Sequence, residues 1–170
     1  MQTPSNITSL DLTRPLSLYL PDEAATARLG ALIASQLRAG DVVYLSGDLG
    51  AGKSSLARGL IRALTNLEQE VPSPTFTLIQ AYETPAFPLL HLDLYRIGSP
   101  GEIYELGLDE ALPAGVLVIE WPEKLAHLGF DDHLHIVLEQ ADKTNLPGPA
   151  KGGRVAHITM AGTFRDSTTT

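Results

Sequence analysis

The segment Gly47–Ser54, with the sequence GDLGAGKS, constrains the fold of this chain more than any other. It has the pattern G-x-x-x-x-G-K-[ST] and stands between an apolar run at residues 42–45 and a helical pattern from Lys53 to about Leu64. A strand, a glycine-rich loop and a helix in this order are typical of a phosphate-binding loop (P-loop), because the glycines let backbone N–H groups converge on phosphate oxygens and the helix adds its positive dipole end. We therefore expect an α/β unit that binds phosphate.

Two side chains of this loop have distinct expected roles. Lys53 is expected to bridge the β and γ phosphates of a nucleotide as a mobile point charge, and the Ser54 hydroxyl to bind Mg²⁺. The alternative is a glycine-rich turn that contains lysine and serine without binding phosphate, but the flanking strand and helix make a chance match rarer. The loop residues expected to contact nucleotide are Gly47, Asp48, Leu49, Gly50, Ala51, Gly52, Lys53, Ser54 and Ser55.

Two carboxylates are candidates for the metal and water chemistry that such a loop needs. Asp93 lies toward the end of an apolar run, and Glu120 directly follows the run Gly115–Ile119. Both can emerge at the carboxyl edge of a sheet, where open α/β folds bind ligands. The sequence does not divide metal binding from water activation between them. The alternatives are a salt bridge between Asp93 and Arg96, and a helix cap by Glu120 for the helix that Pro122 opens.

Other polar and aromatic residues allow two interpretations each. Thr75, in a proline-flanked loop, fits either a γ-phosphate sensor or a plain turn. Trp121 fits either a packing anchor or an aromatic wall for a ligand or partner. His91 is interpreted mainly as a packed strand histidine. His133 and His135 alternate on one strand face without a companion at metal-ligand spacing, so a zinc site is not expected.

Hydrophobic periodicity predicts the elements around the loop. An amphipathic helix is expected from Asp22 to about Gly40, and a short one from Ser99 to Gly107. Residues 76–82 and 89–95 are expected to form strands.

The chain of 170 residues is expected to fold as one domain over residues 15–164, with residues 1–14 and 165–170 as flexible ends outside the core. Alternating runs at 133–139 and 154–160 predict an antiparallel hairpin. The predicted fold is a P-loop NTPase-like three-layer αβα structure, with a central, mostly parallel sheet and this hairpin at its C-terminal edge.

Composition limits the surroundings and partners of the chain. It has no cysteine, its net charge is -8, and no apolar run approaches the roughly 18 residues that span a bilayer. We therefore expect a cytoplasmic protein without a membrane contact. The acidic charge disfavours autonomous binding of DNA or RNA, so any link to nucleic acid is expected to pass through a protein partner.

Four motifs, in order GDLGAGKSSLARG, VPSPTFTL, HLDLYR and VIEWPE, resemble those of the TsaE (YjeE) family, the small P-loop ATPase of bacterial tRNA threonylcarbamoyladenosine (t6A) synthesis. The resemblance covers about residues 18–125. Ser54 stands where threonine is usual in the family, a mild departure because the hydroxyl is kept. The match is weak after about Gly129.

The resemblance implies an accessory ATPase that uses ATP and Mg²⁺, works with TsaD and TsaB, contacts tRNA only indirectly through that complex, and turns over slowly alone. Hydrolysis would reset the partner complex during modification of adenosine 37. At the matching positions the resemblance implies that Lys53 binds phosphate, Ser54 binds Mg²⁺, Asp93 is the Walker B-like acid and Glu120 is a magnesium-associated acid needed for hydrolysis. It also implies that Thr75 lies in a switch-like loop, and that Asp22, Glu23 and Thr26 lie near the base or ribose.

Two other functions are consistent with a P-loop. A small-molecule kinase would need a basic lid, but residues 98–138 contain no arginine and one lysine, Lys124. A non-catalytic module that docks with a partner when nucleotide is bound would need Lys53 and Ser54 but not Glu120.

Overall fold

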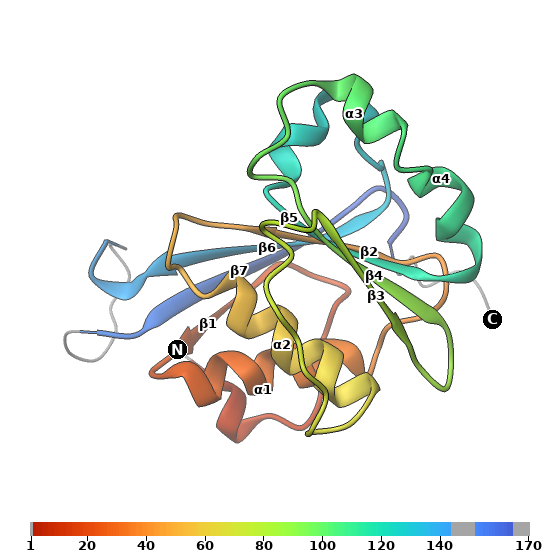
Figure 1. Ribbon diagram of the computed structural model, residues 1–170. Coiled ribbons are helices and arrows are strands. Elements are labelled where there is room, and N and C mark those ends of the chain that lie inside the picture. Colours follow the sequence, from red (N-terminus) through yellow and green to blue (C-terminus); the bar gives the residue numbers. More distant parts are fainter. Residues whose placement is uncertain (1, 144–151, 165–170) are drawn as a thin grey trace.

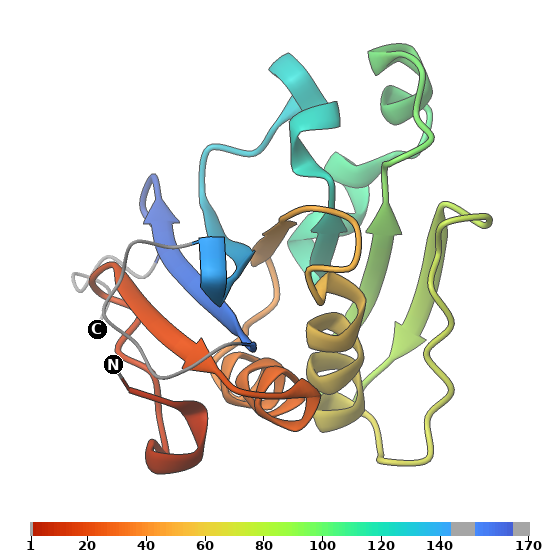
Figure 2. The ribbon, with the colours of Figure 1, turned by 90° about the vertical axis from the view of Figure 1, so that its left-hand side faces the viewer.

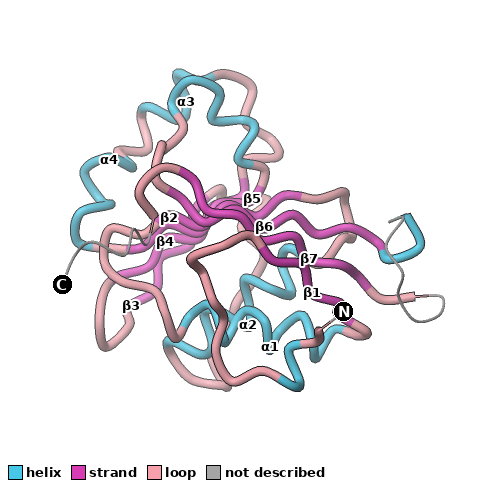
Figure 3. Tube along the Cα trace, turned by 180° about the vertical axis from the view of Figure 1, so that it is seen from behind, coloured by secondary structure: helices cyan, strands magenta, loops and turns pink. Residues whose placement is uncertain are grey.

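A seven-stranded sheet runs through the computed structural model, which describes residues 2–143 and 152–164 (Figure 1). The strand order is β1-β7-β6-β2-β5-β4-β3, with β1 and β3 at opposite edges (Figure 3). The central strands β6, β2, β5 and β4 are parallel, and the remaining pairs are antiparallel. The strands are β1 (Leu16–Leu20), β2 (Val42–Ser46), β3 (Ile79–Glu83), β4 (Pro88–Asp93), β5 (Val116–Glu120), β6 (His133–Gln140) and β7 (Arg154–Ala161).

Helices cover the two faces of the sheet and give it three layers. Because side chains alternate along a strand, Val43 and Leu45 of β2 pack toward one apolar cluster, and Val42 and Tyr44 toward another. The first cluster lies under α1 (Glu23–Ala34) and α2 (Lys53–Leu64), which pack side by side (Figure 2). On the opposite face lie the shorter helices α3 (Pro100–Tyr104), α4 (Leu108–Ala111) and the 3₁₀ segment η3 (Pro122–Leu128) (Figure 1). Three further 3₁₀ turns are η1 (Pro4–Asn6), η2 (Leu112–Ala114) and η4 (Ala141–Lys143).

The predicted fold class is confirmed by this arrangement. The core of the sheet is parallel, and β6 and β7 form the expected antiparallel hairpin over nearly the predicted residues. The helix after the glycine loop spans Lys53–Leu64, as its periodicity predicted. Asp22 begins α1 as expected, since its Oδ1 accepts a hydrogen bond from the Ala25 N–H at 2.8 Å.

The elements differ from the predictions in three places. The helix expected from Asp22 to about Gly40 ends at Ala34. The strand expected from residue 76 begins at Ile79, because residues 74–77 form a turn that leaves the Phe76 side chain 83% exposed. The strand β1 was not predicted; its alternating sequence LSLYL becomes a strand by pairing with β7.

The prediction that residues 1–14 lie outside the core is also wrong. Leu10 and Leu12 are buried in the cluster under α1. The Arg28 guanidinium, on α1, donates to the Pro4 carbonyl at 2.8 Å, and the Gln36 amide, just after α1 ends, donates to the Leu10 carbonyl at 2.9 Å, so this segment is held at two points. The expected C-terminal tail, residues 165–170, lies outside the described residues. Within the part of the chain that is described, no helix is long and apolar enough to cross a membrane.

Candidate functional site

The phosphate loop connects the end of β2 to the first residue of α2. Gly47 has φ +144°, and a Cβ added there would lie 2.5 Å from the Leu138 carbonyl oxygen of β6. Only glycine therefore lets the loop leave the sheet this close to β6. The loop ends at Gly52, which also has a left-handed backbone and directly precedes Lys53.

Lys53 is only 5% exposed, and its side chain lies inside the curve of this loop. Its ammonium donates to the Gly47 carbonyl at 2.6 Å and to the Asp48 carbonyl at 3.0 Å, and it lies 4.2 Å from the centre of the Trp121 ring. Burial lowers the pKa of Lys53, while the neighbouring carboxylates, Glu120 first, act in the opposite direction. The loop thus places one positive charge among backbone dipoles.

The two predicted carboxylates lie together at the carboxyl ends of neighbouring parallel strands. Asp93 is the last residue of β4, Glu120 is the last residue of β5, and the two are partners in the strand register. Both are buried. The Ser54 hydroxyl, in the first turn of α2, lies 3.4 Å from each oxygen of Glu120. This juxtaposition of a loop hydroxyl and two strand-end acids is what their sequence positions predicted.

Neither acid makes the structural contact that was its alternative role, a salt bridge to Arg96 for Asp93 or a helix cap for Glu120. Among the described residues no ion pair joins Asp93 to Arg96, whose guanidinium lies instead 4.4 Å from the centre of the Phe76 ring. Glu120 does not cap η3, whose first turn follows Trp121 without a side-chain cap.

Thr75 joins the loop after α2 to the strand-end acids. Its hydroxyl donates to Asp93 Oδ2 at 2.9 Å, and Ser73 Oγ lies 2.7 Å from the same hydroxyl. Asp93 Oδ1 accepts from the Tyr95 N–H at 2.9 Å, so both of its oxygens are held. Thr75 therefore lies beside the carboxylate with which a switch threonine would share a metal ion.

Trp121 follows Glu120 in a left-handed backbone conformation, with φ +59° and ψ +51°. Such a conformation is uncommon for a bulky residue. It turns the chain away from β5 and sets the indole ring against Lys53 and against the Tyr95 ring, whose centre is 5.0 Å away. Trp121 thus forms one wall of the cleft beside the phosphate loop.

Arg154, a residue that sequence reasoning missed, brings a second positive charge to this cleft. A Cβ built on Gly52 would lie 2.9 Å from Arg154 Nε, so the guanidinium rests directly on the loop where α2 begins. Its Nη1 donates to the Thr26 hydroxyl at 3.5 Å. No local signal in the sequence links a residue at the start of the last strand to a loop a hundred positions earlier.

The predicted base or ribose residues lie next to this cleft but outside its lining. Thr26 is fully buried and contacts Arg154. Glu23 accepts from the Ser55 hydroxyl at 3.1 Å and pairs with Arg58 at 3.5 Å. Asp22 caps α1. The cleft itself, with a volume of about 330 Å³, is lined by Leu49, Gly50, Gly52, Lys53, Ser54, Ser55, Thr75, Asp93, Glu120, Trp121 and Arg154.

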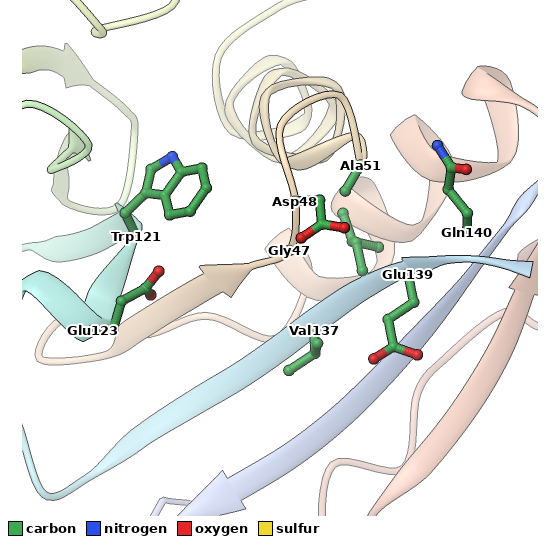
Figure 4. Close-up of a pocket in the computed structure, with 9 residues that line it drawn as sticks. Gly47, Asp48, Ala51, Trp121, Glu123, Val137, Glu139 and Gln140 are labelled. Atoms are coloured by element: carbon green, nitrogen blue, oxygen red, sulfur yellow. The ribbon is translucent and has the colours of Figure 1, made fainter. Parts of the chain in front are cut away.

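A second hollow, of about 380 Å³, also borders the phosphate loop and shares Trp121 with the first cleft (Figure 4). It contains the predicted residues Gly47, Asp48 and Ala51, but also the carboxylates of Glu123 and Glu139. The three acids Asp48, Glu123 and Glu139 would repel a polyphosphate. The first cleft, which holds Lys53 and Arg154, is therefore the one whose charge suits a phosphate group.

The donor set of the cleft fits a magnesium nucleotide. Magnesium takes one or two carboxylates together with hydroxyl, water and phosphate oxygens, rather than a full cage of protein ligands. Ser54, Asp93 and Glu120 offer such a partial set. Residues 2–143 and 152–164 contain no group of three or more His, Asp or Glu side chains arranged to hold a metal alone.

The fold and this cleft define a nucleotide-binding α/β protein of the P-loop type. The sequence profile described as "Threonylcarbamoyl adenosine biosynthesis protein TsaE" matches residues 20–146. The chain belongs to the TsaE family.

Individual relatives agree with this assignment. A Rickettsia felis protein described as tRNA threonylcarbamoyladenosine biosynthesis protein TsaE is 43% identical over 126 residues, which cover 74% of each chain. A Nostoc protein with the same description is 36% identical over 159 residues, covering 90% of this chain and 91% of its own. Among solved structures, Bacillus subtilis YdiB superposes with a TM-score of 0.70 and 27% identity, over 90% of both chains.

Proposed function

We propose that this chain binds and hydrolyses ATP with Mg²⁺ as an accessory protein of tRNA t6A modification, acting with TsaD and TsaB. The observation that carries the proposal is the meeting of Ser54, Asp93 and Glu120 beside the buried Lys53. A P-loop site requires a lysine, a hydroxyl and strand-end acids in this relation.

Each group has a task that follows from its chemistry. Lys53 and the loop N–H groups bind the β and γ phosphates. Ser54 and Asp93 hold the metal ion, which when bound neutralises charge on the phosphate oxygens. Glu120 orients the attacking water and accepts its proton, directly or through a second water. Thr75 ties its loop to Asp93 and so couples that loop to the metal site.

Arg154 and the start of α1 complete the nucleotide site. The Arg154 guanidinium is a fixed cation that can donate two hydrogen bonds to one phosphate group. Its Nη1 lies 3.5 Å from the Thr26 hydroxyl, and Glu23 accepts a hydrogen bond from Ser55 at the edge of the same cleft. Asp22, Glu23 and Thr26 then lie toward the base or ribose, and Trp121 closes the opposite wall.

The pathway assignment rests on the family and on charge. The relatives are described as t6A biosynthesis proteins, and a chain of net charge -8 suits contact with protein partners better than contact with tRNA. We infer that tRNA is reached only through the TsaD and TsaB complex, in the cytoplasm.

The test is ATP binding and hydrolysis by three variants, measured with and without a TsaB and TsaD pair. Lys53→Ala should weaken ATP binding about 100-fold, because a buried charged donor is lost. Glu120→Gln should keep ATP bound but slow stimulated turnover by about 100-fold. Lys124→Ala, which removes an exposed lysine outside the cleft, is the control and should match the wild type.

The outcomes separate the competing functions. Stimulation by the TsaB and TsaD pair alone supports the proposal, whereas transfer of phosphate to a small-molecule acceptor would indicate a kinase. Undiminished turnover by Glu120→Gln, with binding still lost in Lys53→Ala, would favour the non-catalytic, nucleotide-gated module. If Lys53→Ala bound ATP with unchanged affinity, this cleft would not be the ATP-binding site.

A further inference from the structure

His91 makes a buried contact with the carboxylate that the proposed hydrolysis requires. Its Nε2 lies 2.8 Å from Glu120 Oε1, and the two side chains are 1% and 2% exposed. His91 is two residues before Asp93 on β4, and Val118, its partner in the strand register, is two residues before Glu120 on β5. The imidazole therefore reaches along one face of the sheet toward the strand end, where the cleft opens.

The contacts of the ring decide which nitrogen carries its proton. Nδ1 is buried and has no hydrogen-bond partner among the described residues. A proton there would be a buried donor without an acceptor, which is costly. Nε2 faces a carboxylate oxygen, which only accepts. The tautomer with its proton on Nε2 therefore satisfies this contact, with Nε2 donating to Glu120 Oε1.

This bond is the one short hydrogen bond that the described residues make to the Glu120 side chain. The other contact, from the Ser54 hydroxyl, is 3.4 Å long to either oxygen. Ser54 is also the residue proposed to hold the metal ion, through a lone pair of its oxygen. The bond from His91 is the shorter of the two contacts, so His91 is the group that fixes the carboxylate most closely.

We propose that His91 is a positioning residue that holds Glu120 in the orientation facing Ser54 and the phosphate cleft. The inference rests on the proposed function, since it matters for turnover only where Glu120 takes part in hydrolysis. His91 lies behind Glu120 and outside the lining of the cleft, so it acts on the reaction through the carboxylate alone.

Two amide variants test this role, because they imitate different ring nitrogens. His91→Gln places an amide N–H₂ near the position of Nε2, within reach of Glu120, whereas His91→Asn places it near Nδ1, which makes no bond. Both variants remove the ring and keep a polar group in the same core. Tyr82→Phe is the control, since the Tyr82 hydroxyl is buried in the same layer without a partner among the described residues.

The first readout is a crystal structure of each variant, which does not depend on turnover. We expect the separation between Glu120 and Ser54 Oγ to be kept in His91→Gln and to change by more than 1 Å in His91→Asn. The same separation in both variants would overturn the inference. An absence of ATPase activity in the wild type would defeat the proposed function and leave this measurement intact.

The second readout is stimulated ATP turnover, divided into kcat and KM. His91→Asn should lower kcat about tenfold with KM within about threefold of the wild type, and His91→Gln should recover most of kcat. Tyr82→Phe should behave as the wild type. Equal losses in His91→Asn and His91→Gln would indicate a packing role and overturn the inference.

A double-mutant cycle with Glu120→Gln completes the test. If His91 acts through Glu120, adding His91→Asn to Glu120→Gln should lower kcat by less than about twofold further. A full additional tenfold loss would mean that His91 acts independently of Glu120, and the positioning role would be wrong.

Discussion

The cleft brings two cations, Arg154 and Lys53, close to two acids, Asp93 and Glu120, in a chain whose net charge is -8. Lys53 belongs to the loop itself, whereas Arg154 comes from β7 and rests on Gly52. The two charges differ in kind: the lysine ammonium is a compact point charge, and the guanidinium is a planar fork suited to paired phosphate oxygens. Their separate origins mean that the hairpin of β6 and β7 contributes a charge to the proposed nucleotide site.

Replacing Arg154 with alanine should therefore weaken ATP binding by about tenfold or more, since charge-assisted hydrogen bonds contribute about 1.5–3 kcal/mol. Arg154→Lys should restore only part of the affinity, because the fork is lost. Calorimetric titration with ATP measures both. Arg14→Ala is the matched control, because it also removes one positive charge, from an exposed ion pair with Asp11. Equal affinities for Arg154→Ala and Arg14→Ala would show that Arg154 does not contact the nucleotide.

Residues of the site differed in how far the sequence predicted them. Lys53 and Ser54 belong to one contiguous motif, and Asp93 and Glu120 each end an apolar run, so local pattern was enough to find them. Arg154 and the contact of His91 with Glu120 depend on which strands are neighbours. That information is absent from any local window, because it arises from pairing across the whole sheet.

At the scale of elements, α1 and α2 cross so closely that glycine is required at the contact. A Cβ on Gly59 of α2 would overlap the Ala27 carbonyl oxygen and lie 2.6 Å from Ala27 Cα. A Cβ on Gly30 of α1 would overlap the Leu56 carbonyl oxygen. The crossing fixes the position of α2, and therefore of Lys53 and Ser54 at its first turn.

Gly59→Ala should lower the free energy of unfolding by about 1–3 kcal/mol, because the backbone of α1 must move to admit a methyl group. Urea unfolding measures this change. The control is Gly101→Ala on α3, where the nearest atom to the added Cβ is 3.9 Å away and stability should be unchanged or slightly raised. A Gly59→Ala variant as stable as Gly101→Ala would show that the helices separate without cost.

Elements were predictable where periodicity was long and unpredictable where it was short. The twelve residues of α2 carry a clear helical pattern. In contrast, Leu16–Leu20 is an alternating run of five residues between two prolines, which suits an extended loop as well as a strand. Its pairing with β7, more than 130 residues away, decides between them. Phe76 has strand-forming character, but the Pro74 turn keeps it out of β3.

At the scale of the whole molecule, the sheet links the site to groups on its opposite face. His135 of β6 lies on the side away from α1, and its Nε2 is 2.8 Å from the hydroxyl of Ser46, the residue before the phosphate loop. The rings of His133 and Tyr44 lie about it, with centres 6.0 Å and 6.1 Å away. The end of β2 is thus held by His135 on the face away from α1.

Burial, and to a lesser extent the neighbouring His133, lowers the pKa of His135 below 6.5, and Glu123 opposes this effect. Between the folded-state pKa and pH 6.5 the unfolded chain therefore binds more protons at His135 than the folded chain, so protonation favours unfolding. The contribution to stability is present above pH 6.5 and is lost as the pH falls toward the folded-state value. Urea unfolding at pH 7.5 and pH 5.5 should show a smaller loss of stability for His135→Gln than for the wild type. A loss in His135→Gln as large as in the wild type would place the pH sensitivity elsewhere in the protein.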